Sequence, residues 1–199
     1  MHRLIEFQQL ILRFSVIERA TRHPDNFEKH ETDTEHSYTL AMAAWFLAQY
    51  FPQFDEHTII KLSLVHDLLE VHAGDTYAFA DASVLSGKAE REAAAVEQLA
   101  KEWPDFPEIT SAIHEYEARQ TDEAKFIYAL DKLMPILLNY LNQGRSWQHH
   151  GVTFEKFVAE KEAKIPISPE IYAYYKELLA ILQEHLDFFA NEEQPAPKS

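Results

Sequence analysis

Residues 55–75 read DEHTIIKLSLVHDLLEVHAGD, and this stretch decides the fold. Its apolar residues recur three and four positions apart, which is the spacing that stacks side chains on one face of a helix. The pattern predicts a helix over residues 56–72 that is apolar nearly all round, and therefore a helix buried inside a bundle. His66 and Asp67 stand among these apolar residues, and a buried polar pair requires a chemical reason.

The rest of the 199-residue chain also favours a helical protein. It holds only 4 glycines and 9 prolines and few alternating β-branched runs, so we expect an all-α fold. Thr32 with Glu35 forms a capping box, and Ser168 before Pro169 is a cap followed by a first-turn proline. The expected helices cover residues 2–20, 34–51, 56–72, 87–102, 106–118, 122–143, 153–163 and 169–189.

The segments between these helices indicate a single domain. We expect loops over residues 21–33 and 144–151, where polar residues, proline or glycine gather. The chain has no internal repeat, so residues 1–190 are expected to form one helical domain. Residues 191–199 hold two prolines and almost no apolar residue, and we expect them to be a frayed tail.

Charge and composition exclude several classes of function. The chain carries 33 acidic against 18 basic residues, which gives a formal net charge of -15. Such a surface repels nucleic-acid backbones and anionic membranes, so we expect neither as a partner. No run approaches the roughly 20 apolar residues of a membrane span. The chain has no cysteine, which excludes disulfides and thiolate chemistry and makes a cytoplasmic location the default expectation.

Four polar side chains occupy positions where the helical pattern calls for apolar ones. His36 and Asp131 lie on apolar helix faces, as His66 and Asp67 do. Burying a carboxylate without a partner costs several kcal/mol of folding free energy. Basic residues that could serve as partners are scarce at inward positions. One divalent cation such as Mn, Co, Fe, Ni or Zn would account for two imidazoles and two carboxylates together. A lone buried histidine is more often a hydrogen-bonded core residue, so the spacing alone leaves both interpretations open.

The ordered set of His36, the pair His66-Asp67 and Asp131 resembles the signature of the HD-domain superfamily of metal-dependent phosphohydrolases. The extended form HD-x-x-E followed by G-D is similar to its 5'-nucleotidase and 5'-deoxynucleotidase group, and the resemblance covers residues 17–141. It implies a single-domain HD-type helical bundle. It also implies that these four residues hold one divalent metal ion. Mg then joins Mn, Co, Fe, Ni and Zn as a candidate for this ion.

The resemblance implies roles for three further residues. Glu70, one turn past the histidine of the pair, acts on the attacking water as a general acid or base. Asp75 serves in catalysis and substrate binding, where it holds the sugar hydroxyl or the water. Arg19 matches the arginine that binds the phosphate, although from the residues alone it would be a solvated surface arginine. Ala20 follows it, so no aromatic ring is present there to pack on the sugar.

The predicted function is the removal of the 5'-phosphate from nucleoside or deoxynucleoside monophosphates by attack of a metal-bound hydroxide. The expected partner is a small-molecule nucleotide, and a homodimer is an open expectation because similar proteins often form one. Three alternatives stay open: an HD-type phosphodiesterase or pyrophosphohydrolase, a two-iron oxygenase, and a non-catalytic helical interaction module stabilised by metal. The shortage of additional histidines argues against the other HD-type enzymes.

Overall fold

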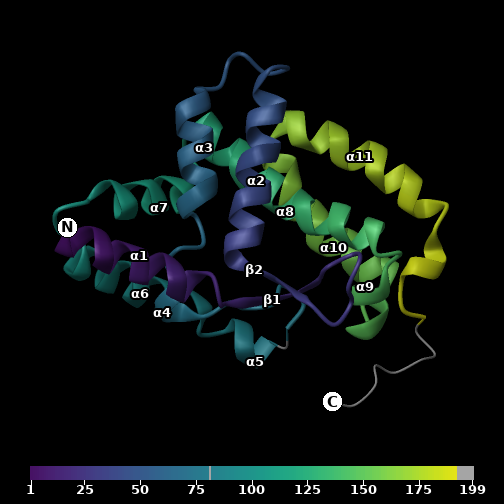
Figure 1. The fold of residues 1–199 in the computed structure, drawn as a ribbon. Coiled ribbons are helices and arrows are strands. Elements are labelled where there is room, and N and C mark those ends of the chain that lie inside the picture. Colours follow the sequence, from purple (N-terminus) through teal and green to yellow (C-terminus); the bar gives the residue numbers. More distant parts are fainter. Residues whose placement is uncertain (81, 192–199) are drawn as a thin grey trace. The chain divides into compact units, whose positions relative to one another are not determined.

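The computed structural model describes residues 1–80 and 82–191, and the chain divides into two compact units (Figure 1). The first unit comprises residues 1–19 and 31–124, and the second comprises residues 20–30 and those from 125 onward. Helices dominate both units, which confirms the predicted all-α fold. Of the expected tail, residues 192–199 lie outside the described residues.

The first unit is built from helices around an apolar core. Helix α2 packs on α3, α3 packs on α7, and α4 packs on both α1 and α6. Leu10, Leu99 and Ile113 are fully buried in the core between these helices. The helices are α1 (His2–Phe14), α2 (Asp33–Ala48), α3 (Glu56–Val65), α4 (Glu70–Ala73), α5 (Ala82–Leu85), α6 (Lys88–Glu102) and α7 (Glu108–Ala118).

The second unit has an aromatic core. Trp147 stacks on Phe189 with ring centroids 4.5 Å apart, and Phe157 lies 5.0 Å from Trp147. Gly144 has φ 72°, and a Cβ there would lie 2.1 Å from the backbone oxygen of Phe188, so only glycine fits. The helices are α8 (Asp122–Leu141), whose first turn still belongs to the first unit, α9 (Arg145–His149), α10 (Phe154–Glu162) and α11 (Pro169–Gln183), with the 3-10 turns η1 (Ile165–Ile167) and η2 (Leu186–Phe188).

A short β-hairpin replaces the end of the expected first helix and most of the expected loop after it. Helix α1 ends at Phe14, and β1 (Glu18–Arg22) pairs with β2 (His30–Thr32). The β-branched residues Val16 and Ile17 weaken the helix at this point. The following backbone groups then find their hydrogen-bond partners in the second strand instead of in a helical turn.

The expected helix over residues 56–72 is interrupted at the pair His66-Asp67. The amide of His66 donates to the carbonyl of Leu62, four residues back, at 3.0 Å. The amide of Glu70 instead donates to the carbonyl of Asp67, three residues back, at 2.9 Å. This is the tighter 3-10 pattern, in which side chains three apart lie over one another. Asp67 and Glu70 therefore project to the same side.

Other boundaries are mostly close to those expected. The capping box at Thr32 and the cap at Ser168 are confirmed by their hydrogen bonds. The expected loop 144–151 contains α9, and α11 ends at Gln183 before the turn η2. Leu64 is 47% exposed, so the prediction that α3 is buried nearly all round was wrong. None of the helices in the described ranges combines the length and apolar character that crossing a membrane requires.

Candidate metal centre

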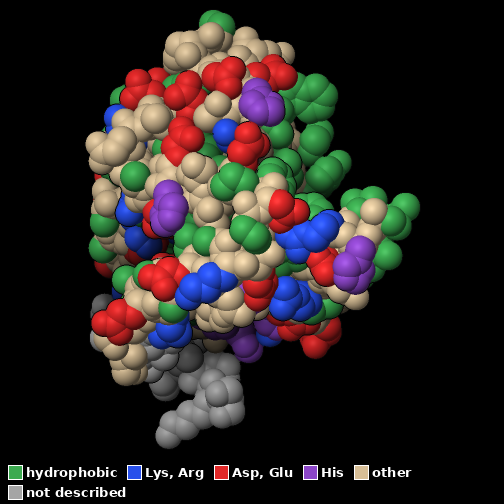
Figure 2. All heavy atoms as spheres, turned by 90° about the vertical axis from the view of Figure 1, so that its left-hand side faces the viewer, with side chains coloured by type: hydrophobic (Ala, Val, Ile, Leu, Met, Phe, Trp, Pro, Cys, Tyr) green, Lys and Arg blue, Asp and Glu red, His purple; other side chains and the backbone are tan. Residues whose placement is uncertain are grey.

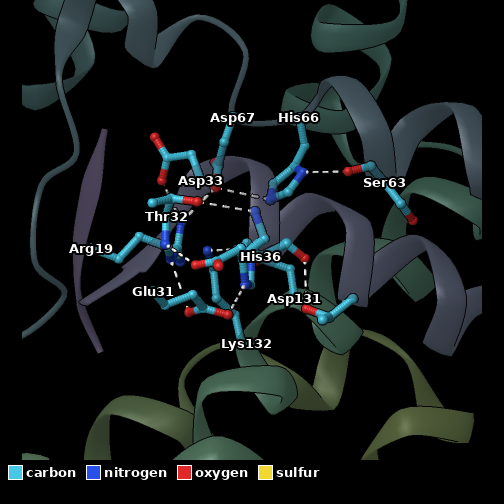
Figure 3. A network of polar contacts seen from close by, with 12 residues as sticks. Arg19, Glu31, Thr32, Asp33, His36, Ser63, His66, Asp67, Asp131 and Lys132 are labelled. Atoms are coloured by element: carbon cyan, nitrogen blue, oxygen red, sulfur yellow. Dashed lines mark hydrogen bonds and ion pairs between the residues drawn. The ribbon is translucent and has the colours of Figure 1, made fainter. Parts of the chain in front are cut away.

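Three side chains of ligand type converge in the first unit (Figure 3). His36 comes from α2, His66 from the end of α3, and Asp67 from the 3-10 turn that follows. One nitrogen or oxygen atom of each lies within 4.8 Å of the others. Both imidazoles are buried, and the Asp67 side chain is 18% exposed. Three of the four predicted ligands therefore lie together.

The orientation of His66 is fixed from two sides. Its Nδ1 lies 2.9 Å from the carbonyl oxygen of Ser63, and because a carbonyl only accepts, Nδ1 carries the proton. The ring of Tyr116 on α7 packs against it with centroids 5.1 Å apart. Nε2 then faces Oδ2 of Asp67 at 3.0 Å. An imidazole nitrogen and a carboxylate oxygen held side by side in this way are two suitable ligand atoms for a divalent cation.

A carboxylate that the sequence did not single out lies beside His36. Oε1 of Glu31 lies 3.6 Å from its Nδ1, and the Glu31 side chain is mostly buried at the end of the hairpin. A carboxylate beside one nitrogen of a ligating imidazole fixes the ring and increases the basicity of the other nitrogen. Glu31 thus has the position of a supporting residue.

Arg19 lies on strand β1 and not, as predicted, at the end of the first helix. Its NH1 group lies 2.8 Å from Oδ2 of Asp67 and 3.2 Å from Oδ1 of Asp33. Its Nε lies 3.5 Å from Oε2 of Glu31. The side chain is only 14% exposed, so Arg19 is part of this centre and not a solvated surface arginine.

Around Arg19, the carboxyl groups outnumber the single positive charge that this residue supplies. One oxygen each of Asp33, Asp67 and Glu70 lies within 4.8 Å of the others. Burial, reinforced by Asp67, raises the pKa of Asp33 to about 6. Burial, followed by the charges of Asp67 and Asp33, raises the pKa of Glu70 to about 11. Asp33, which the sequence did not single out either, belongs to the same acidic cluster as the predicted acid or base.

Asp75 follows Gly74, which has φ 73° and turns the chain at the end of α4. Burial raises the pKa of Asp75, and its charge contributes to the raised pKa values of Glu70 and Asp33. It therefore lies close enough to act electrostatically on this cluster, as a residue that binds a sugar hydroxyl or a water near the centre would.

Asp131 lies on α8 in the second unit, where it is 2% exposed. Its Oδ2 accepts a hydrogen bond from Nζ of Lys132 at 2.6 Å. The inward position that the helical pattern predicts is confirmed by this burial. Its place in the ligand set of the first unit stays a prediction.

The residues present fit a divalent cation. The donor set combines imidazole nitrogens with carboxylate oxygens, which suits Mn, Fe, Co, Ni or Zn. The cluster of Asp33, Asp67 and Glu70 carries more negative charge than Arg19 neutralises. A bound cation would oppose the rise in these carboxyl pKa values, because its charge favours the ionised forms.

These features define a helical protein whose first unit carries a buried cluster of side chains that could hold a divalent cation. The model of the HD domain family matches residues 12–172, which include every residue of the centre named above. The chain belongs to the HD domain family. This agrees with the resemblance that the sequence motifs carry.

Individual relatives agree with this family assignment. The chain is 32% identical to the 5'-deoxynucleotidase HDDC2 of Xenopus laevis over 136 residues, which are 67% of this chain and 66% of the relative. It is 31% identical to the protein of that name from Mus musculus, over 67% of each chain. The crystal structure of a predicted metal-dependent phosphohydrolase from Magnetospirillum magnetotacticum is similar with a TM-score of 0.76 and 31% identity. That similarity covers 95% of this chain and 96% of the other.

Proposed function

We propose that this protein is a metal-dependent phosphomonoesterase that removes the 5'-phosphate from nucleoside monophosphates, with deoxynucleotides among its substrates. The observation that carries the proposal is the convergence of His36, His66 and Asp67 beside Glu70 and Arg19. The curated relatives named 5'-deoxynucleotidases support the reaction and the substrate class. The similar crystal structure of a phosphohydrolase supports the class of chemistry.

A divalent ion would be held by His36, His66, Asp67 and Asp131. When bound, such an ion supplies Lewis acidity that activates water and draws charge from the phosphoryl oxygens. Mn, Co, Fe, Ni, Zn and Mg are the candidate ions. The match of the family model to residues 12–172 supports including Asp131, because that match continues from the first unit into the second.

Glu70 is the acid or base of the reaction. Its carboxyl group lies beside Asp67, one 3-10 turn away, and it is 5% exposed. A buried carboxyl group with a raised pKa can hold a proton near neutral pH and transfer it at its Oε atoms. Asp75 orients the sugar hydroxyl or the attacking water from the end of α4.

Arg19 binds the phosphate. In the structure its guanidinium group lies against the carboxylates of Asp67, Asp33 and Glu31. Asp67 and Asp33 also lie beside Glu70. A planar guanidinium group offers parallel donors to phosphate oxygens. To bind the substrate, Arg19 would turn these donors from the carboxylates toward the phosphate.

The test is a panel of nucleoside and deoxynucleoside monophosphates with the metal-stripped protein and added Mn, Co, Mg or Zn. The proposal predicts release of inorganic phosphate and free nucleoside only when a cation is present. Cyclic nucleotides and nucleoside triphosphates in the same panel separate the phosphodiesterase and pyrophosphohydrolase alternatives. A protein that is stabilised by metal but hydrolyses none of these substrates would be a non-catalytic module, and two irons with uptake of dioxygen would indicate an oxygenase.

We further propose that the protein acts in the cytoplasm on small-molecule nucleotides, that residues 1–190 work as one HD-type domain, and that the chain forms homodimers. The absence of cysteine from the sequence supports the location. The family match over residues 12–172 supports one functional domain. The net charge of -15 supports the expectation that neither nucleic acid nor anionic membrane is a partner.

A further inference from the structure

Side chains from two segments of the second unit gather around one phenylalanine ring. The first segment, residues 22–30, joins β1 to β2, and the second is helix α9 with the residue that follows it. The side chains are Arg22, Phe27, Arg145, His149 and His150, and we call them the Phe27 patch.

Two guanidinium groups lie over the ring of Phe27. The guanidinium carbon of Arg145 is 5.0 Å from the ring centre, and that of Arg22 is 5.5 Å from it. The imidazole of His149 packs edge-to-face against the same ring with centroids 6.1 Å apart, and His150 lies 4.9 Å from His149. An aromatic face attracts cations at this distance, so Phe27 holds two groups of like charge close together.

Neither arginine of the patch pairs with a carboxylate among the residues that the structure describes. Arg145 donates from Nη2 to the carbonyl of Pro24 at 3.0 Å and from Nε to that of Asn142 at 3.1 Å. Arg22 donates from Nη1 to the carbonyl of Glu28 at 3.5 Å, and its buried Nε has no hydrogen-bond partner there. Carbonyl groups orient a guanidinium group without neutralising it, so both positive charges are available to an anion.

The charges around His150 have the same sign. Burial lowers the pKa of His150, and the charges of His149 and Arg22 contribute to the lowering. A negatively charged ligand at the patch would oppose this effect, because its charge favours the protonated imidazole. The patch is thus the opposite of the acidic cluster around Asp67, where carboxyl groups are in excess.

The patch belongs to a strongly acidic chain. Residues 142–151, NQGRSWQHHG, contain no Asp or Glu, although the net charge of the chain is -15. Asp and Glu side chains recur over the whole of the face that Figure 2 shows. The field of such a protein repels anions from most of its surface, so an anion that binds requires a local group of positive charges.

The chemistry of the patch fits an oligophosphate, that is, a chain of two or three phosphate groups. Guanidinium groups bind phosphate oxygens through parallel donors. Because Arg22 and Arg145 lie within 5.5 Å of the same ring centre, one such chain can contact both at once. A carboxylate carries a single charge and would balance only one of them.

We propose that the Phe27 patch is a binding site for oligophosphate anions, either free or as part of a nucleoside triphosphate. The site uses none of the side chains of the candidate metal centre. It does not depend on the reaction proposed above, so either proposal can fail without the other.

The test is a calorimetric titration of inorganic triphosphate into the full metal-stripped chain at low ionic strength. The proposal predicts binding that Arg145→Gln weakens by about tenfold to a hundredfold. Arg145→Lys keeps the charge without the planar donors and should recover part of this loss. Arg13→Gln is the matched control, because Arg13 is 54% exposed on α1 in the first unit, and it should bind triphosphate as the wild type does.

A second measurement does not depend on the stability of the arginine variants. In NMR spectra of the wild-type chain, the imidazole resonances of His149 and His150 should shift when triphosphate is added. The resonances of His36 and His66 serve as the internal comparison. A chain that does not bind triphosphate, an Arg145→Gln protein that binds it as the wild type does, or shifts confined to His36 and His66 would overturn the proposal.

Adenosine triphosphate in the same titration identifies the source of the phosphate groups. An affinity equal to or higher than that of inorganic triphosphate would assign the site to nucleoside triphosphates. A lower affinity would assign it to free oligophosphate.

Discussion

Each unit of the molecule buries a cluster of charged side chains, and the two clusters differ in balance. In the second unit, Oε2 of Glu160 lies 2.9 Å from Nζ of the buried Lys161, and Lys164 also bonds this carboxylate. Burial alone would raise the pKa of Glu160, but the two ammonium groups lower it overall. In the first unit, the acids outnumber Arg19, and the pKa values of Asp33 and Glu70 are raised.

This difference shows which kind of buried charge marks a functional site. A cluster whose carboxylate faces ammonium groups of the protein, such as Glu160 with Lys161 and Lys164, is a structural set of ion pairs. In a cluster where buried carboxyl groups outnumber the cationic side chains, a ligand, a proton or a metal ion must offset the excess negative charge. The cluster around Asp67 is of the second kind, and the one around Glu160 is of the first.

The largest expected effect comes from removing a ligand of the first cluster. Asp67→Ala removes a metal ligand and the carboxylate that pairs with Arg19. We expect no measurable Mn binding by calorimetry and no measurable phosphate release. Asp25→Ala, which alters an exposed aspartate, should leave both unchanged. An Asp67→Ala protein that binds Mn as the wild type does would show that the acidic cluster is not a metal site.

The next effect separates catalysis from metal binding. Glu70→Gln keeps the shape of the side chain but removes its ability to transfer a proton. Turnover should fall by roughly 100- to 10,000-fold, while Mn binding is retained. The exposed Glu97→Gln is the matched control for the same chemical change. Full activity in the Glu70→Gln protein would remove this residue from the mechanism.

A smaller effect, on KM, is expected from substituting Arg19, the positively charged residue of the first cluster. Arg19→Ala removes the charge-assisted hydrogen bonds to the phosphate, so KM for nucleoside monophosphates should rise by about tenfold to a hundredfold. Arg19→Lys keeps the charge without the planar donor pair and should recover part of this loss. Steady-state kinetics of the two variants measure this, and unchanged KM values would limit Arg19 to a structural ion pair.

A change in the ion pairs of Glu160 should affect stability and leave activity unchanged. Glu160→Gln removes the carboxylate beside Lys161, which is 4% exposed, and should lower the free energy of unfolding by about 3–5 kcal/mol. Urea titration of this variant gives the change in stability. Turnover per folded molecule and Mn binding are expected to match the wild type. A selective loss of turnover without loss of stability would mean that both clusters are functional.

Much of the fold could be predicted because its signals are local. The capping box of Thr32 and Glu35 and the cap at Ser168 involve residues three or fewer positions apart, and both were found. The strand Glu18–Arg22 was missed because its hydrogen-bond partners are in His30–Thr32, beyond the range of any helical or strand period. The interruption after Val65 was missed because apolar spacing does not distinguish an α-helical turn from a 3-10 turn.

The same reasoning explains which site residues could be predicted. The sequence indicated His36, His66 and Asp67 because they interrupt an apolar pattern. It did not indicate Glu31 and Asp33, because acidic residues near the start of a helix are ordinary partners of the helix dipole. Only the hairpin that carries Arg19 reveals their role. The unusual number of acids in HETDTEH, residues 30–36, was the signal that could have found them.

The central claim is that one divalent ion is held by His36, His66 and Asp67 together with Asp131. Crystals soaked in Mn and measured at its absorption edge test it most directly. The account predicts one anomalous peak within roughly 2.0–2.3 Å of a nitrogen or oxygen atom of all four side chains. A chain that shows no peak there, or a peak that Asp131 does not contact, would contradict it.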